Sequence, residues 1–182
     1  MPRPSLLALA VLALAHPADA EIAAPEGQVL VTLGGALAEG NRGASTAEDL
    51  TVLGKLGAVF ETGIALDAEM LAALPAREIA KTLPGSDVPA TFSGPTLAAV
   101  MAMAGAEGKM AIPFALDGYQ AEIPWEMIEA HDPILATHVD GRPLGIGGLG
   151  PTMTVFPVVE DAEVYESFLP LQVWATVYVG VE

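Results

Sequence analysis

The chain of 182 residues contains no cysteine. This absence excludes a disulfide, a thiolate ligand to a metal and a redox-active dithiol. Basic residues are also scarce, with 7 Lys and Arg against 23 Asp and Glu and a formal net charge of −16. Because such a surface repels phosphate backbones and anionic lipids, we expect neither nucleic acid nor a membrane surface as a partner.

Long hydrophobic runs are missing as well. The apolar run Leu6–Ala15 has about half of the roughly 20 residues that a membrane-spanning helix needs. It follows Arg3 and precedes Ala18-Asp19-Ala20, which is the pattern of a signal peptide with its cleavage site. We therefore expect residues 1–20 to be a signal peptide cleaved after Ala20, and residues 21–182 to be one periplasmic domain without a membrane span. A retained N-terminal anchor is the alternative.

Apolar residues are abundant, at 52% of the chain. This fraction is well above that of disordered acidic chains, so the charge does not predict disorder. A chain of this length can bury one proper core, which predicts a single folded domain.

Glycine and proline mark the turns in the central part of the chain. Asp117-Gly118 and Asp140-Gly141 each stand between apolar residues, a pattern that predicts hairpins because glycine accepts positive φ. Pro124 and Pro133 bracket a short helix. The Gly-rich loop 147–151 precedes an apolar strand over residues 153–156. Its backbone N–H groups could approach a ligand, or it could be a plain tight connection, and the sequence leaves both readings open.

Periodicity predicts further elements on either side of this region. Strands are expected at 28–33, 78–82 and 171–181, the last with Trp174 and Tyr178 on one aromatic face. Asp67 is suited to cap a short helix. The main helix is expected to open at Ser93-Gly94-Pro95 and to bury its apolar positions between residues 97 and 104. Residues 49–60 fit either a strand or a short helix.

The order of several weak motifs resembles the molybdopterin-binding domain of the sulfite oxidase family. These motifs are TFSGPTLAAVMAMAGAEG at 91–108, DGY at 117–119, ILATHVDGRPL at 134–144 and LGPTMTVFP at 149–157. The resemblance extends over residues 28–180. It implies a single α+β domain with a mixed β-sheet and a few short helices.

The resemblance also carries expectations about chemistry. Enzymes of that family hold molybdenum through one cysteine and bind the cofactor phosphate with basic side chains. This chain has no cysteine and no basic cluster, so we expect no molybdenum and no catalytic residues. The open enzymatic alternatives are a molybdopterin-dependent oxidoreductase with a non-cysteine ligand and a hydrolase.

Small exported members of the same superfamily include pterin-binding regulators. Thr82, Asp117-Gly118-Tyr119 and Gly150-Pro151 hold places that correspond to their pattern. A carboxylate can accept both the N–H and the amino group of a pterin edge. Asp117 is the expected acceptor, and Tyr119 or Trp125 is the expected stacking ring.

Arg142 is the further residue expected near that ligand. With so acidic a chain, we expect an unphosphorylated pterin, and we expect the protein to report to the periplasmic domain of a membrane receptor. The competing non-catalytic reading is a protein-interaction module without a ligand. The histidines His131 and His138 lack metal-site spacing, and the acidic run 160–166 is expected to be a solvated surface.

Overall fold

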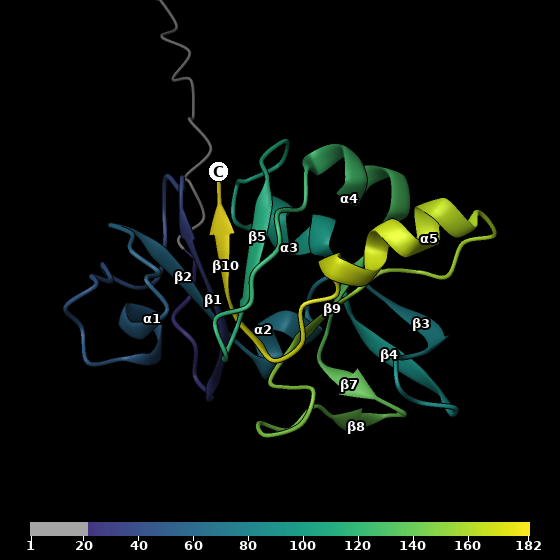
Figure 1. The fold of residues 1–182 in the computed structure, drawn as a ribbon. Coiled ribbons are helices and arrows are strands. Elements are labelled where there is room, and N and C mark those ends of the chain that lie inside the picture. The colour runs from purple at the N-terminus through teal and green to yellow at the C-terminus, as the bar shows by residue number, and fades with distance from the viewer. Residues whose placement is uncertain (1–21) are drawn as a thin grey trace, which may run out of the picture.

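The computed structural model describes residues 22–182, so the expected signal peptide lies outside the described residues (Figure 1). The first sheet has the strand order β2-β1-β10-β5. Its strands are β1 (Val29–Gly35), β2 (Gly63–Asp67), β5 (Ala111–Ala115) and β10 (Thr176–Val181). β1 and β10 pair in parallel, while β2 and β5 pair antiparallel to their neighbours. The sheet is therefore mixed, as expected.

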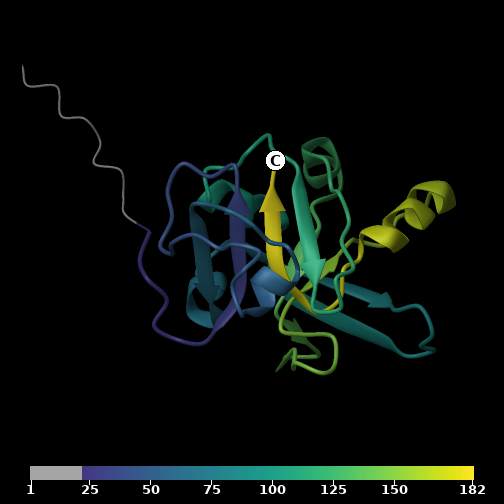
Figure 2. The same cartoon turned by 60° about the vertical axis from the view of Figure 1, so that its left-hand side comes forward.

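Two smaller sheets complete the domain. One has the order β3-β4-β7-β8, from β3 (Ala76–Thr82), β4 (Pro89–Pro95), β7 (His138–Val139) and β8 (Arg142–Pro143). The other pairs β6 (Ile134–Ala136) with β9 (Met153–Val155). The expectation of one sheet is wrong, because the chain passes from one sheet to another at Thr137, between β6 and β7. Figure 2 shows the strands β3 and β4 extending away from the first sheet.

Short helices cover one face of the first sheet. They are α2 (Ala68–Ala72), α3 (Leu97–Met103) and α4 (Trp125–His131). A further helix, α5 (Ala162–Phe168), runs into a 3-10 turn at Leu169–Leu171 and extends away from that sheet (Figure 2). The main core lies between α2, α3, α4 and the sheet, and it includes Leu33 of β1 together with Leu97 and Val100 of α3. The expected apolar positions of α3 are thus buried, whereas Ala102 on its other face is exposed.

The opposite face of the first sheet is covered by the loop region that includes α1 (Val52–Lys55). Here the Phe60 ring stacks on Tyr178 of β10 at 5.7 Å between centroids. A Cβ at Gly34 would overlap the Phe60 ring, so the strand needs glycine there. The undecided segment 49–60 is therefore a short helix followed by an irregular return, and β10 is buried on both faces.

Two expectations about element ends need correction. Ser93-Gly94-Pro95 is the end of β4 and not the start of the main helix, whose cap is Thr96 with its side chain accepting from the Ala99 N–H. Neither β2 nor the strand character of β4 was expected. The C-terminal strand begins at Thr176 rather than at residue 171, and Trp174 is exposed while Tyr178 is buried, so there is no aromatic face.

Candidate functional site

The turn that follows β5 carries the first part of the site. Gly118 has φ +91°, and the Asp117 Oδ1 atom accepts a hydrogen bond from the Tyr119 N–H at 2.9 Å. An isolated bridge from Phe114 to Gln120 closes the turn. The predicted Asp117-Gly118 turn is confirmed, although a single bridge stands where a second full strand was expected. This local geometry leaves the Asp117 Oδ2 atom without a hydrogen bond among the described residues.

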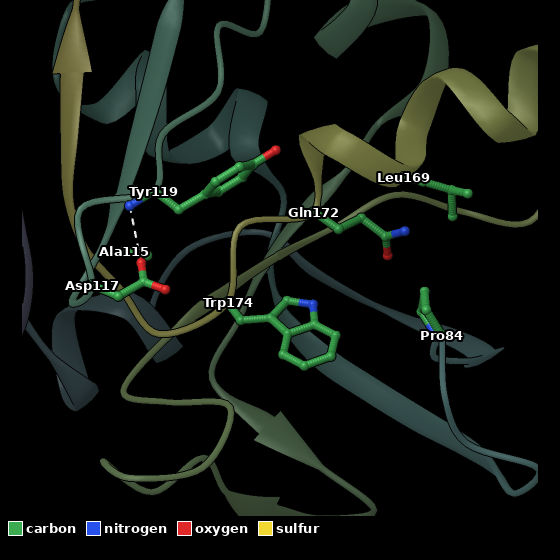
Figure 3. A pocket seen from close by; sticks show the side chains of 7 residues that line it. All are labelled: Pro84, Ala115, Asp117, Tyr119, Leu169, Gln172 and Trp174. Carbon is green, nitrogen blue, oxygen red and sulfur yellow. Dashed lines mark hydrogen bonds between the residues drawn. The ribbon is translucent and has the colours of Figure 1, made fainter.

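Asp117 and Tyr119 border a pocket of about 260 Å³ (Figure 3). Its walls come from three parts of the chain that are distant in sequence. The lining residues are Pro84, Ala115, Asp117, Tyr119, Leu169, Gln172 and Trp174. The volume is close to the lower limit of about 300 Å³ for small-molecule sites. A compact ring system therefore fits this pocket better than an extended cofactor does.

Two aromatic side chains face the opening. In Figure 3 the Tyr119 ring lies on one side of the opening and the Trp174 indole on the other, with Asp117 at one end and Gln172 beyond them. Tyr119 is 48% exposed and Trp174 is 41% exposed. The Tyr119 hydroxyl donates to the Pro170 carbonyl at 2.8 Å, which anchors its ring. Exposed aromatic faces anchored in this way can stack on a flat ligand.

The backbone beside Trp174 is held from both sides. Ala175 has φ +50°, a left-handed conformation that is uncommon for a residue with a Cβ. Its N–H donates to the Leu149 carbonyl at 2.9 Å, and its carbonyl accepts from the Leu116 N–H at 3.0 Å. These two hydrogen bonds hold Trp174 beside the Asp117 turn. Strained backbone at a pocket is typical of a site where position matters more than stability.

Gln172, at the end of the pocket opposite Asp117, contacts a buried lysine. Lys81 of β3 is 3% exposed, and its ammonium donates to the Gln172 Oε1 atom at 2.6 Å and to the Phe156 carbonyl at 3.0 Å. It also lies 5.4 Å from the centre of the Tyr165 ring. Burial lowers the pKa of Lys81 from 10.5 to about 8. No carboxylate pairs with this ammonium among residues 22–182.

Not all of the residues proposed from the sequence meet at this pocket. Asp117 and Tyr119 line it, whereas the other four lie elsewhere. Thr82 ends β3, and Trp125 begins α4 and packs against the main core. Arg142 is exposed on the Asp140-Gly141 hairpin, and Gly150 is buried at the cis peptide bond with Pro151.

Sequence reasoning missed three contributors, namely Lys81, Gln172 and Trp174. The sequence signal for Trp174 was an aromatic residue on the surface side of the last strand region. No signal pointed to Lys81 or Gln172, because their proximity depends on how β3 meets the segment before β10.

The Gly-rich loop does not line the pocket, but it makes a hydrogen bond to the backbone segment that carries Trp174. The Gly148 and Gly150 N–H groups both donate to the Gly145 carbonyl at 3.1 Å. Through its Leu149 carbonyl the loop holds Ala175. Of the two readings left open by the sequence, the structure favours a tight connection.

The residues at the pocket do not fit a molybdenum cofactor. The chain has no cysteine to supply a thiolate, and the lining residues include no Arg or Lys to bind a cofactor phosphate. Within residues 22–182, no three His, Cys, Asp or Glu side chains are grouped as metal ligands.

The histidines and the acidic run have structural roles. His131 ends α4 and packs edge-on against Phe168 at 4.7 Å between centroids. His138 Nδ1 lies 2.8 Å from the Thr137 hydroxyl. In the acidic run, Asp161 caps α5 by accepting from two backbone N–H groups, while Glu163 and Glu166 are exposed.

Across the part of the chain that the structure describes, no helix is long and apolar enough to cross a membrane.

Comparison with known proteins gives a distant likeness of fold. No family model matches the chain, and no curated protein matches it. The chain is similar to the crystal structure of the sulfane dehydrogenase SoxCD from Paracoccus pantotrophus, with 16% sequence identity and a TM-score of 0.53. The match covers 88% of this chain but 39% of that one. That neighbour has a sulfite oxidase-like molybdopterin fold, and at this identity the likeness concerns the fold alone.

Proposed function

We propose that this protein is a non-catalytic, exported ligand-binding protein of the sulfite oxidase-type molybdopterin-binding fold, which binds an unphosphorylated pterin and reports its presence to the periplasmic part of a membrane receptor. The observation that carries this proposal is the pocket in which the Asp117 carboxylate lies beside two exposed aromatic rings, Tyr119 and Trp174. The expected signal peptide and the distant fold likeness support it.

The chemistry of a pterin matches these groups. Its pyrimidinone edge carries an N–H and an amino group side by side, and one carboxylate can accept from both. The unpaired Oδ2 atom of Asp117 and the remaining lone pairs on Oδ1 provide these acceptors. The flat bicyclic ring then lies between Tyr119 and Trp174, where stacking adds to the affinity.

Titration of pterin into the purified protein, followed by calorimetry or pterin fluorescence, tests the proposal. We expect binding well below millimolar concentration in the wild type. Asp117→Asn should weaken it by roughly 1.5–3 kcal/mol, the value of a hydrogen bond to a charged group. Lumazine, which carries an oxo group in place of the 2-amino group, should bind more weakly to the wild type.

Glu122→Gln is the matched control, because Glu122 is exposed in the segment that follows the Asp117 turn and does not line the pocket. It should leave pterin affinity unchanged. Absence of binding below millimolar pterin, or equal affinity of wild type and Asp117→Asn, would contradict the proposal.

A protein-interaction module is the second candidate, and a separate observation favours it. Leu50, just before α1, is 92% exposed, and Val52, the first residue of α1, is 51% exposed. With Leu56 and Leu116 they border an apolar groove of about 500 Å³. Exposed apolar patches of this kind are typical of protein contacts.

A photo-crosslinking residue at position 50, used with and without pterin, tests whether the groove is a contact surface. The interaction module predicts a specific membrane-protein adduct from position 50 in cells, whether or not pterin is present. A crosslinker at the exposed Glu107 should give no such adduct. If no adduct forms from position 50 while pterin binds, the groove is not the contact surface.

A further inference from the structure

Within residues 22–182, β3 is the one long edge strand whose free side no other part of the chain covers. A sheet edge presents backbone N–H and C=O groups to which a further strand can bind, and proteins commonly cover, shorten or interrupt their edges for this reason. The other edges of the three sheets are protected in one of these ways, so the exception at β3 needs an explanation.

Both edges of the first sheet are covered. Beside β2, the side-chain amide of Asn41 takes the place of a strand, because it accepts from the Ala65 N–H at 2.7 Å and donates to the Ala65 carbonyl at 2.9 Å. Beside β5, Ala111 and Ile123 exchange two backbone hydrogen bonds of 3.0 and 2.9 Å. A further strand cannot reach the backbone groups that these contacts use.

The smaller sheets are also closed, apart from β3. The edge strand β8 has two residues, one of which is Pro143, and both shortness and proline protect an edge. The free side of β6 is bridged where Thr96 pairs with Ile134. On β9 the Thr154 N–H donates to the Val173 carbonyl at 2.9 Å.

The pairing of β4 shows which backbone groups of β3 point outward. β3 has seven residues and pairs with β4 along its whole length. The carbonyls of Thr91 and Ser93 in β4 accept from the Asp140 and Thr137 N–H groups, on the side of β4 that faces away from β3. Because opposite residues of an antiparallel pair alternate between bonded and non-bonded, Thr91 and Ser93 belong to the non-bonded pairs between β3 and β4.

The residues of β3 opposite them therefore direct their backbone groups to the open edge. Ser93 is opposite Glu78 and Thr91 is opposite Ala80, and the same alternation adds Thr82. No residue in the described part of the chain donates to or accepts from the backbone of Glu78, Ala80 or Thr82. All three side chains are exposed. β3 thus presents a row of accessible donors and acceptors, and it extends away from the first sheet (Figure 2).

The cations of β3 do not protect this edge. Lysine on an edge strand commonly prevents further pairing, but Arg77 and Lys81 alternate with the exposed residues and lie on the other face of the strand. Arg77 pairs with Asp132 at 2.7 Å, and Lys81 donates to Gln172 at 2.6 Å. The charge on the exposed face of β3 is that of Glu78.

We propose that β3 is a docking edge for an extended cationic segment of a partner protein, which adds as an antiparallel strand beside Glu78, Ala80 and Thr82. In strand addition, main-chain hydrogen bonds supply affinity and alternate side chains supply selectivity. Lys or Arg opposite Glu78 makes a favourable cross-strand pair, and the net charge of −16 attracts such a segment. A second copy of this chain would bring the same negative charge to the edge, which opposes association. No pterin is required for this contact.

The antiparallel arrangement fixes which backbone groups of the partner are used. In a hydrogen-bonded pair, two opposite residues exchange both bonds, and their side chains lie on the same face of the sheet. A lysine whose side chain lies beside Glu78 therefore also uses its own N–H to bind β3. The residues between successive lysines direct their N–H groups away from β3.

A synthetic peptide with alternating lysine and valine, seven residues long and blocked at both ends, tests this geometry. With a fluorescent label, its binding is measured by anisotropy. We expect binding below millimolar concentration. Methylation of the lysine backbone nitrogens should weaken binding by about tenfold or more, because several hydrogen bonds are lost, whereas methylation of the valine nitrogens should change it by less than about twofold. Absence of binding below millimolar peptide, or equal effects of the two methylations, would overturn the inference.

Ala80→Pro removes an outward N–H and no hydrogen bond to β4, and proline is tolerated on an edge strand in this way. Ala80→Thr keeps the N–H and is the matched control. We expect Ala80→Pro to weaken peptide binding by about fivefold or more relative to Ala80→Thr, and equal affinity of the two would contradict the inference. Urea unfolding checks that both variants are folded. If Ala80→Pro does not fold, the methylated peptides on the wild type still decide.

Two further measurements test the choice of partner. Glu78→Gln should weaken binding of the lysine peptide by about threefold or more, while Glu122→Gln, at an exposed carboxylate away from β3, should not. Equal affinity of these variants would show that the net charge alone attracts the peptide and would overturn the inference. In sedimentation the wild type should be a monomer. A dimer that Ala80→Pro converts to monomers would assign the edge to a second copy of this chain and overturn the cationic partner.

Discussion

Lys81 lies in an environment that a lysine side chain disfavours. A lysine ammonium is strongly hydrated, and burial without a carboxylate partner disfavours its charged form. This explains why its pKa falls to about 8. Two carbonyl acceptors and the Tyr165 ring offset part of the lost hydration.

This burial predicts how stability changes with pH. Below pH 8 Lys81 is charged in both the folded and the unfolded protein. Between pH 8 and about 10.5 the unfolded chain retains a proton that the folded protein has released, so the free energy of unfolding rises with pH. Relative to Lys81→Met, the wild type should gain up to roughly 3 kcal/mol across this window. Urea unfolding of both proteins at a series of pH values measures the gain.

Ionisation of Tyr178 changes the free energy of unfolding at higher pH, and in the opposite direction to that of Lys81. Burial, together with the nearby Glu182 charge, raises its pKa to about 12. The folded protein therefore keeps the phenol proton between pH 10 and 12 while the unfolded chain loses it, and stability falls. Both proteins of the Lys81 comparison share this loss, so it cancels in their difference. Lys55→Met removes an exposed lysine and keeps Lys81, so it is the control: the difference in free energy of unfolding between the wild type and Lys55→Met should not change between pH 8 and 10.

At the scale of elements, β4 and β6 are in close backbone contact. Gly94 of β4 lies against the β6 backbone, where an added Cβ would overlap the Leu135 carbonyl oxygen and lie 2.8 Å from the Ala136 Cα atom. Backbone cannot move aside as a flexible side chain can. Glycine is therefore required at this position for the two sheets to pack.

Gly94→Ala should lower the free energy of unfolding by about 1–3 kcal/mol, the range observed for overpacked sites. Gly43→Ala is the matched control, because a Cβ there would meet nothing within 4 Å. It should change stability by less than about 0.5 kcal/mol. Chemical denaturation of the two variants measures both values. Equal stability of the two variants would show that β4 and β6 are not in such close contact.

At the scale of the whole molecule, charge is the dominant property. With a net charge of −16 and no Arg or Lys lining the pocket, the protein should bind its ligand by hydrogen bonds and stacking rather than by ion pairs. Hydrogen bonds between short-range partners are hardly screened by salt, whereas exposed ion pairs are.

We therefore expect the dissociation constant for pterin to change by less than about twofold between low and high salt. Between these salt concentrations the Debye length falls from about 30 Å to about 3 Å, which screens long-range charge interactions but not direct hydrogen bonds and stacking contacts. Titrations at several sodium chloride concentrations measure this. Phosphorylated molybdopterin should bind more weakly than pterin, and more so at low salt. Tighter binding of the phosphorylated ligand would show that the field of the protein does not govern its choice of ligand.

The parts of this fold that follow from local chemistry were predictable from the sequence. The Asp117-Gly118 and Asp140-Gly141 turns, the Asp67 cap and the short helix between Pro124 and Pro133 each depend on a few adjacent residues. The buried positions of α3 follow from helical spacing. These features are settled by backbone preferences within a few residues, which the sequence carries directly.

The division into three sheets and the composition of the pocket were decided by the tertiary structure. The end of β4, Ser93-Gly94-Pro95, was predicted as the start of a helix because such residues are common there. Its pairing with β3 and β7 overrides this local preference. Asp117 and Tyr119 were proposed from the resemblance and from their turn, but Gln172 and Trp174 line the same pocket from a distant part of the chain, and Lys81 contacts Gln172 from β3. Which remote side chains meet depends on how separate elements pack together, and no local pattern in the sequence contains that information.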